Sequence, residues 1–124
     1  MDYQYYNDYE LLFLLEENDE IARMIFTRKY RPLVYEEAKI YYNRIKMEDL
    51  EGLSFAELVS LGDQALERAR LSFNDNKGAL FYTYFIVCLR SSFHLYYRGL
   101  KAKKNQMFFT YDEKDYQVED AISF

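Results

Sequence analysis

The sequence predicts an all-α fold, a compact bundle of about four to five helices that ends in a long C-terminal helix. Three observations lead to this prediction. Apolar residues make up 50% of the 124 residues, enough to fill the core of one domain. Four glycines and one proline are few breakers for a chain of this length. Apolar residues also recur at spacings of three and four, the period of a helix with one buried face.

Three helices are predicted in the first half of the chain. The first runs to about Glu17 with Asp8 as its N-cap, and its leucines recur at helical spacing. The second covers residues 20–30. Pro32 begins the third, because the missing N–H of proline costs nothing in a first turn, and that helix ends near Arg44. The stripe that this third helix buries is made of Val34, Ala38 and Tyr41.

Two more helices are predicted in the second half. Ser54, followed three residues later by Glu57, is the pattern of a capping box. The apolar face of the helix that follows consists of Leu58, Leu61, Ala65, Leu66 and Ala69. Residues 74–78 form a turn, and the last helix runs from about residue 79 to residue 101. We therefore expect a helical domain over residues 1–104, followed by an acidic tail or linker of low order over residues 105–124.

Charge is distributed unevenly along the chain. The net charge is −5, which argues against a general nucleic-acid coat protein. Residues 1–20 carry seven acids and no bases. The segment 90–104 carries five bases and no acids, namely Arg90, Arg98, Lys101, Lys103 and Lys104. One short basic stripe on an acidic body fits a local phosphate contact together with a separate protein partner.

The sequence offers no pattern of an enzyme. It has no Gly-rich phosphate loop, no metal-ligand spacing and no nucleophile–histidine pair, and its single cysteine, Cys88, lies six residues from its single histidine, His94. We expect no enzymatic activity, no cofactor and no metal. No apolar run approaches the roughly 20 residues that span a bilayer, and no signal peptide is recognisable, so we expect a cytoplasmic protein with no membrane partner.

Two patterns along the chain are informative when they are taken together. The first covers the entry helices, with a small-acidic opening at residues 18–22, a Tyr-x-Pro-Leu-Val-Tyr segment at residues 30–35, and Ala38. The second extends over 34 residues without a gap. Its members are Glu57, Leu58, Gly62, Leu66, Ala69, Phe73, Gly78, Phe81, Thr83, Tyr84 and Arg90. Both patterns resemble the region 2 domain of bacterial sigma factors. The resemblance covers residues 8–104 and implies a transcription initiation factor.

The resemblance implies two binding surfaces. In the family, the helix after Ser54 lies on the clamp helices of the beta-prime subunit of core RNA polymerase. The small residues Gly62 and Ala65 would let another helix approach closely. The residues that the resemblance places against the polymerase are Glu57, Ser60, Leu61, Gln64 and Arg68. The resemblance also allows an anti-sigma factor as a further partner.

The second surface would recognise and melt the promoter minus-ten element. In the family, aromatic and hydroxyl side chains at the start of the last helix hold flipped bases of the nontemplate strand. A flipped base loses its stacking on neighbouring bases, and stacking on a protein ring restores about 1–3 kcal/mol per base. We expect mixed roles in core and binding for Phe81 and Tyr84. The residues implied in DNA binding are Phe81, Thr83, Tyr84, Arg90, Ser91, His94, Arg98, Lys101, Lys103 and Lys104.

The chain also departs from the family. Val87 and Cys88 stand where primary sigma factors have a Trp pair that helps to open the duplex, which points to an alternative sigma factor that melts weakly and needs a good promoter. The clamp-facing Gln and Glu of the family are Ser60 and Leu61 here. The pair at residues 96–97, both Tyr, has no counterpart in the family.

Two other functions stay open at this point. One is a protein-binding helical module that mimics a sigma domain and regulates polymerase without binding DNA, which the overall acidity favours. The other is a helix-turn-helix repressor, disfavoured because no short two-helix unit with a tight Gly turn is recognisable. Residues 109–113 resemble the segment that follows region 2, so we expect the chain to belong to a longer protein with a further domain for the minus-thirty-five element.

Overall fold

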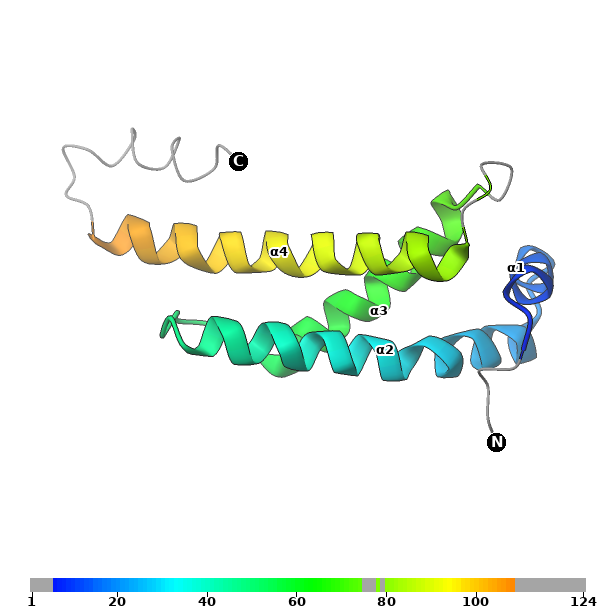
Figure 1. Cartoon of the computed structure of the whole chain (residues 1–124), viewed down its shortest axis with the longest axis horizontal. Coiled ribbons are helices and arrows are strands. Elements are labelled where there is room, and N and C mark those ends of the chain that lie inside the picture. The colour runs from blue at the N-terminus through cyan, green and yellow to red at the C-terminus, as the bar shows by residue number, and fades with distance from the viewer. Residues whose placement is uncertain (1–5, 75–77, 79, 109–124) are drawn as a thin grey trace.

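The computed structural model describes residues 6–74, 78 and 80–108, and for residues 106–108 it describes the backbone alone. These residues form four α-helices and no strand: α1 (Asp8–Glu16), α2 (Glu20–Lys46), α3 (Phe55–Ser72) and α4 (Phe81–Phe108). Figure 1 shows α2 and α4 running in the same direction and α3 crossing both in the opposite direction. The α1 helix lies beside the start of α2. The predicted all-α bundle with a long C-terminal helix is confirmed.

The prediction of Asp8 as the N-cap of the first helix is wrong by one residue, because the helix already begins at Asp8. The side chain of Asn7 accepts hydrogen bonds from the backbone N–H groups of Tyr9 and Glu10, at 2.8 and 3.2 Å. Asn7 is therefore the N-cap, and Asp8 is the first helical residue, which leaves its carboxylate available for other contacts. Leu11 and Leu15 are buried against the body of the protein.

The α2 helix corrects the prediction of two helices broken at Pro32. It is one helix of 27 residues with Pro32 inside it. Proline removes one helical hydrogen bond, but its ring lies on the exposed side, while one buried stripe continues on both sides of it. This stripe consists of Ala22, Phe26, Tyr30, Val34, Ala38 and Ile45. Burial of the common stripe outweighs the local cost of the proline, and so the helix continues.

The third helix begins as predicted, and most of its predicted apolar face is buried. Ser54 Oγ accepts the backbone N–H of Glu57 at 3.2 Å, so Ser54 is the N-cap. The buried face consists of Leu58, Gly62, Ala65, Leu66 and Ala69, and Leu61 is half-buried at its edge. This face packs against both α2 and α4, which also contact each other directly.

The last helix is longer than predicted. Four of its residues at successive intervals of four are almost fully buried, namely Phe81, Phe85, Leu89 and Phe93. The helix continues past residue 101 to Phe108, so residues 105–108 are helical and do not belong to a tail of low order. The predicted start at residue 79, most of the turn before it and the expected linker at residues 109–113 lie outside the described residues.

A second, smaller core holds the C-terminal part of α4 against the loop between α2 and α3. It contains Ile45, Leu50 and Leu100. The Tyr96 hydroxyl donates to the carbonyl of Gly52 at 3.1 Å and accepts the N–H of Ser54 at 3.0 Å. Gly52 has φ +91°, a conformation that glycine adopts without strain. Tyr96 therefore holds this loop in place.

Candidate functional site

The five residues that the sequence places against a polymerase lie on one face of α3. Glu57, Ser60, Leu61, Gln64 and Arg68 follow one another at helical spacing. All are exposed except Leu61, which is half-buried. Their face lies beside the buried stripe of the same helix, since Leu61 packs partly against the core and Arg68 reaches Ser92 of α4. The structure thus brings this set together on a continuous outward surface, which we call the α3 outward face.

Gly62 and Ala65 do not belong to this outward face. A Cβ atom added to Gly62 would lie 2.4 Å from Val34 Cγ1 and 3.3 Å from Leu89 Cδ1. Ala65 is 1% exposed. The close helix approach that these small residues permit is therefore the packing of α3 on α2 and α4 within the chain, and the expectation that they admit an external helix is wrong.

Arg68 connects the α3 outward face to α4. Its guanidinium Nη2 donates to Ser92 Oγ at 3.1 Å. Ser92 is buried, whereas Arg68 is exposed, so the arginine reaches from the surface to a polar group at the edge of the core. Arg68 therefore has a structural contact in addition to the binding role that the resemblance implies.

Phe81 is a core residue. Its side chain is 1% exposed, and its ring centroid lies 5.2 Å from that of Phe26 and 5.3 Å from that of Phe73. A base cannot reach a ring enclosed in this way, so the expected mixed role in core and base stacking is corrected to a core role. The spacing of four between Phe81, Phe85, Leu89 and Phe93 was the sequence signal that pointed to the core.

The residues that flank Phe81 are more accessible. Tyr82 and Thr83 are exposed, and Tyr84 is half-buried. The hydroxyl groups of Tyr84 and Ser72 lie 2.7 Å apart, which fixes the Tyr84 ring against the end of α3. Tyr82 was not among the predicted residues, although one half of its surface is exposed. A helical wheel anchored on the buried phenylalanines places Tyr82 on their side of the helix, so spacing alone gave no signal that its ring is accessible.

The outward face of α4 carries most of the remaining predicted DNA contacts. Thr83, Arg90, Ser91, His94 and Lys101 are all exposed on this face, with the exposed Val87 among them. Arg98 is half-buried, Lys103 is exposed, and Lys104 is half-buried. The structure thus gathers polar, basic and aliphatic groups along one side of a 28-residue helix.

Several of these bases have acidic or carbonyl partners within the chain. Arg90 forms an ion pair at 2.9 Å with Glu37, and this hydrogen bond raises the pKa of Arg90. Lys101 donates to the Tyr97 hydroxyl at 3.1 Å and lies 3.7 Å from Glu48. The hydrogen bond with Tyr97 and the charge of Glu48 raise the pKa of Lys101.

Glu48 is the centre of this second group of contacts. Its carboxylate accepts the hydroxyl of Tyr97 at 2.7 Å, and its backbone carbonyl accepts Lys104 Nζ at 3.2 Å. These contacts hold the C-terminal half of α4 against the end of α2. They also reduce the positive potential that this end of α4 offers to a phosphate.

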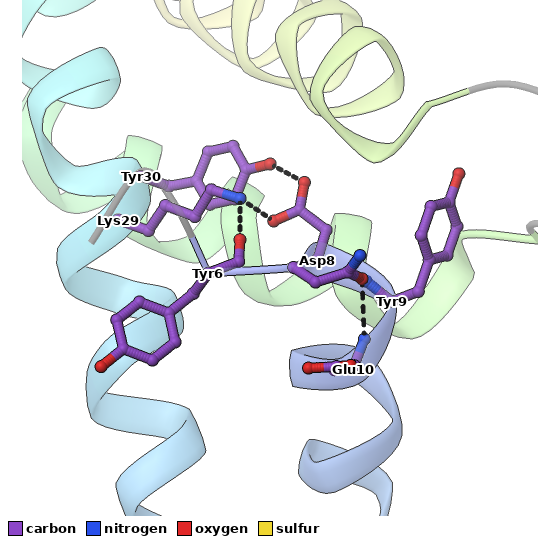
Figure 2. Close-up of polar contacts among 7 residues, drawn as sticks. Tyr6, Asp8, Tyr9, Glu10, Lys29 and Tyr30 are labelled. Carbon is purple, nitrogen blue, oxygen red and sulfur yellow. Dashed lines mark hydrogen bonds and ion pairs between the residues drawn. The ribbon is translucent and has the colours of Figure 1, made fainter. Parts of the chain in front are cut away.

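A further polar cluster joins α1 to α2 and was not predicted. Figure 2 shows the Asp8 carboxylate between Lys29 and Tyr30, with 2.5 Å from Oδ1 to Lys29 Nζ and 2.5 Å from Oδ2 to the Tyr30 hydroxyl. Burial, followed by the hydrogen bond to Asp8, raises the pKa of Tyr30 well above its usual value. The cluster lies beside a hollow of about 390 Å³ that Tyr82 also lines.

Comparison with protein-family models, with curated proteins and with solved structures found no match. In the described part of the chain, no helix is both long and apolar enough to cross a membrane. Among the same residues, no three His, Cys, Asp or Glu side chains are grouped as metal ligands would be.

Proposed function

We propose that this chain is the region 2-like domain of an alternative sigma factor, a cytoplasmic promoter-recognition subunit. It binds the clamp helices of the beta-prime subunit of core RNA polymerase and recognises and melts the minus-ten element. The sequence resemblance motivates the proposal. The observation that supports it most is the α3 outward face, because the five residues selected by the resemblance lie together there and all but Leu61 are exposed.

The chemistry of the α3 outward face suits a helical partner. An 18-residue helix is about 27 Å long, so it offers a long, narrow surface. Glu57, Ser60 and Gln64 present one carboxylate, one hydroxyl and one amide, which recognise polar side chains of a coiled coil. Leu61 adds a half-buried apolar contact. In this proposal these side chains bind the clamp, and Arg68 remains partly engaged with Ser92.

The DNA-binding part of the proposal rests on the outward face of α4. With Phe81 in the core, a separated strand would meet the exposed Thr83 and His94 on this face, and Tyr82 beside the hollow near Tyr30. The exposed Lys103 supplies a phosphate contact. Because Arg90 and Lys101 are paired with carboxylates, their contribution to strand affinity is small in this proposal.

A second candidate function is a polymerase-binding module that mimics a sigma domain and binds no DNA. Two observations favour it. The Phe81 ring is enclosed in the core, and the basic side chains of Arg90 and Lys101 are compensated within the chain. The α3 outward face has the same role in both candidates, so the polymerase contact is their common element.

Binding measurements with purified core polymerase and single-stranded minus-ten oligonucleotides test the proposal. We expect the wild-type chain to bind both, and the double variant Gln64→Ala/Arg68→Ala to lose polymerase binding. Asn43→Ala, an exposed change on α2, is the matched control and keeps it. Thermal unfolding shows whether loss of the Arg68–Ser92 contact has altered the fold. Polymerase binding without oligonucleotide binding at low salt selects the mimic, and no binding to either contradicts both candidates.

A further inference from the structure

The outward face of α1 carries apolar side chains that the fold does not use. Tyr9, Phe13 and Leu14 are 42%, 61% and 38% exposed. Leu11 and Leu15, on the other side of the same helix, already fill its contact with the core. A nine-residue helix on the surface of a small protein needs only one apolar face, and α1 has a second.

These side chains form a concave surface. Tyr9, Phe13 and Leu14 line, together with Glu10, a shallow open hollow of about 440 Å³. We call these four residues the α1 patch. A hollow lined by two aromatic rings and a leucine accepts an apolar side chain from a partner, and rings of this kind dominate the energetics of many protein interfaces.

The α1 patch is held rigidly by contacts on the other side of its helix. Asp8 binds Lys29 and Tyr30, and Lys29 Nζ also donates to the backbone carbonyl of Tyr6 at 2.8 Å. In Figure 2 the Tyr9 ring points away from this cluster. Fixing the helix in advance reduces the entropy that a partner would lose on binding, so the surface is preorganised for docking.

The negative charge around the α1 patch indicates the kind of partner that it can bind. Glu10 and Glu17 are exposed beside it, whereas Glu16 lies close enough to Arg70 to raise the pKa of that arginine, and no base occurs among residues 1–20. Among the described side chains, neither Glu10 nor Glu17 has a salt-bridge partner. Such a negative rim repels nucleic acids and anionic membranes, and it also repels the chain's own segment 109–124, which has five acids and one lysine. It attracts a cationic surface.

We propose that the α1 patch docks an amphipathic helix of another protein, whose apolar stripe is flanked by Lys and Arg. An apolar side chain of that helix enters the hollow at Tyr9 and Phe13, and its bases face Glu10 and Glu17. The surface lies on α1, outside the faces of α3 and α4 discussed above, so this inference does not depend on the proposed polymerase or DNA contacts.

Nuclear magnetic resonance titration of the labelled chain with a synthetic peptide tests the proposal. The probe is an amphipathic helical peptide with a leucine stripe flanked by lysines, and the comparison peptide has glutamate at every lysine. We expect binding of the lysine peptide alone, weakened by salt, with perturbed resonances at Tyr9, Phe13 and Leu14. Phe13→Ser should lower the affinity at least about tenfold, a loss of about 1.4 kcal/mol. Ile40→Ser, an exposed apolar residue of α2, is the matched control and leaves the affinity unchanged.

Other results would overturn the proposal. These are equal binding of both peptides, perturbations confined to α2, α3 or α4, or unchanged affinity in Phe13→Ser with a wild-type circular dichroism spectrum. Two further measurements test whether something other than a basic helix binds the α1 patch. A dimer in sedimentation that Phe13→Ser dissociates would assign the α1 patch to a second copy of this chain. Binding to vesicles with anionic lipid that the same change abolishes would assign it to a membrane surface.

Discussion

Arg90 Nη2 lies 2.9 Å from a carboxylate oxygen of Glu37, and this ion pair joins α4 to α2 at a place where Glu37 is only 6% exposed. Among the described residues, Glu37 is the one acidic side chain that is buried. A carboxylate in such a position needs a charged partner, because burying an unpaired charge is costly. The sequence resemblance assigns Arg90 to DNA, whereas the structure gives it a role in the fold.

Replacing Arg90 by alanine is therefore expected to destabilise the protein. The change leaves the Glu37 carboxylate buried without its partner, and the midpoint of thermal unfolding should fall by several degrees. The double variant Glu37→Met/Arg90→Leu removes both charges and should recover most of the loss. Circular dichroism melting curves measure both effects. An Arg90→Ala variant as stable as the wild type would show that the ion pair does not support the fold.

The contact between α2 and α3 at Gly62 gives a second prediction. In Gly62→Ala the new Cβ would meet Val34 Cγ1 at 2.4 Å, so the helices must separate or repack, at a cost of about 1–3 kcal/mol. Gly99→Ala is the matched control, because nothing lies within 4 Å of its added Cβ. It should stabilise α4 by about 0.5–1 kcal/mol. Urea unfolding measures both free energies, and a Gly62→Ala variant at least as stable as the wild type contradicts the packing described.

Phe81 and Tyr82 are neighbours with opposite environments. Phe81→Ala removes a fully buried ring and should cost about 3–5 kcal/mol of unfolding free energy. Tyr82→Ala changes a half-exposed side chain and should alter stability by no more than about 0.5 kcal/mol. If α4 binds a single strand, Tyr82→Ala lowers oligonucleotide affinity at unchanged stability. Equal destabilisation by the two changes would place Tyr82 in the core as well.

The Asp8–Lys29–Tyr30 cluster predicts how stability depends on alkaline pH. Burial and the Asp8 carboxylate raise the pKa of Tyr30 in the folded protein above the value near 10 of an unfolded chain. A raised folded pKa means that this contribution to stability is complete below about pH 10 and is lost as the pH rises further. Stability should thus decline above about pH 10, and less steeply in Tyr30→Phe. Chemical unfolding at several pH values measures this, and identical slopes in both proteins would contradict it.

Local signals in the sequence were sufficient for much of the fold. The Ser54 cap and the apolar face of α3 follow from residues within one helix, and the structure agrees with both. The continuity of α2 through Pro32 did not follow, because it depends on a buried stripe shared by two segments and on the exposed position of the proline ring. The low helix propensity of proline, considered alone, could not show that burial of the shared stripe outweighs its cost.

Less of the candidate site on α3 and α4 than of the fold could be predicted from the sequence. The outward face of α3 follows from helical spacing once the buried face is known. The burial of Phe81, the pairing of Arg90 with Glu37 and the contacts of Glu48 with α4 join residues from different helices. No pattern along the chain specifies such contacts between distant residues. The periodicity of α4 did contain the information that Phe81 faces inward, and the family resemblance gave it a different role.

A photo-crosslinking measurement tests the α3 outward face, the central element of the proposed function, most directly. A photoreactive amino acid replaces Gln64 in one protein and Asn43, exposed on α2, in another, and each is mixed with core RNA polymerase. The proposal predicts a cross-link from position 64 to the clamp helices of the beta-prime subunit, and none from position 43. Absence of the cross-link at position 64, or equal cross-linking from both positions, would contradict binding through α3.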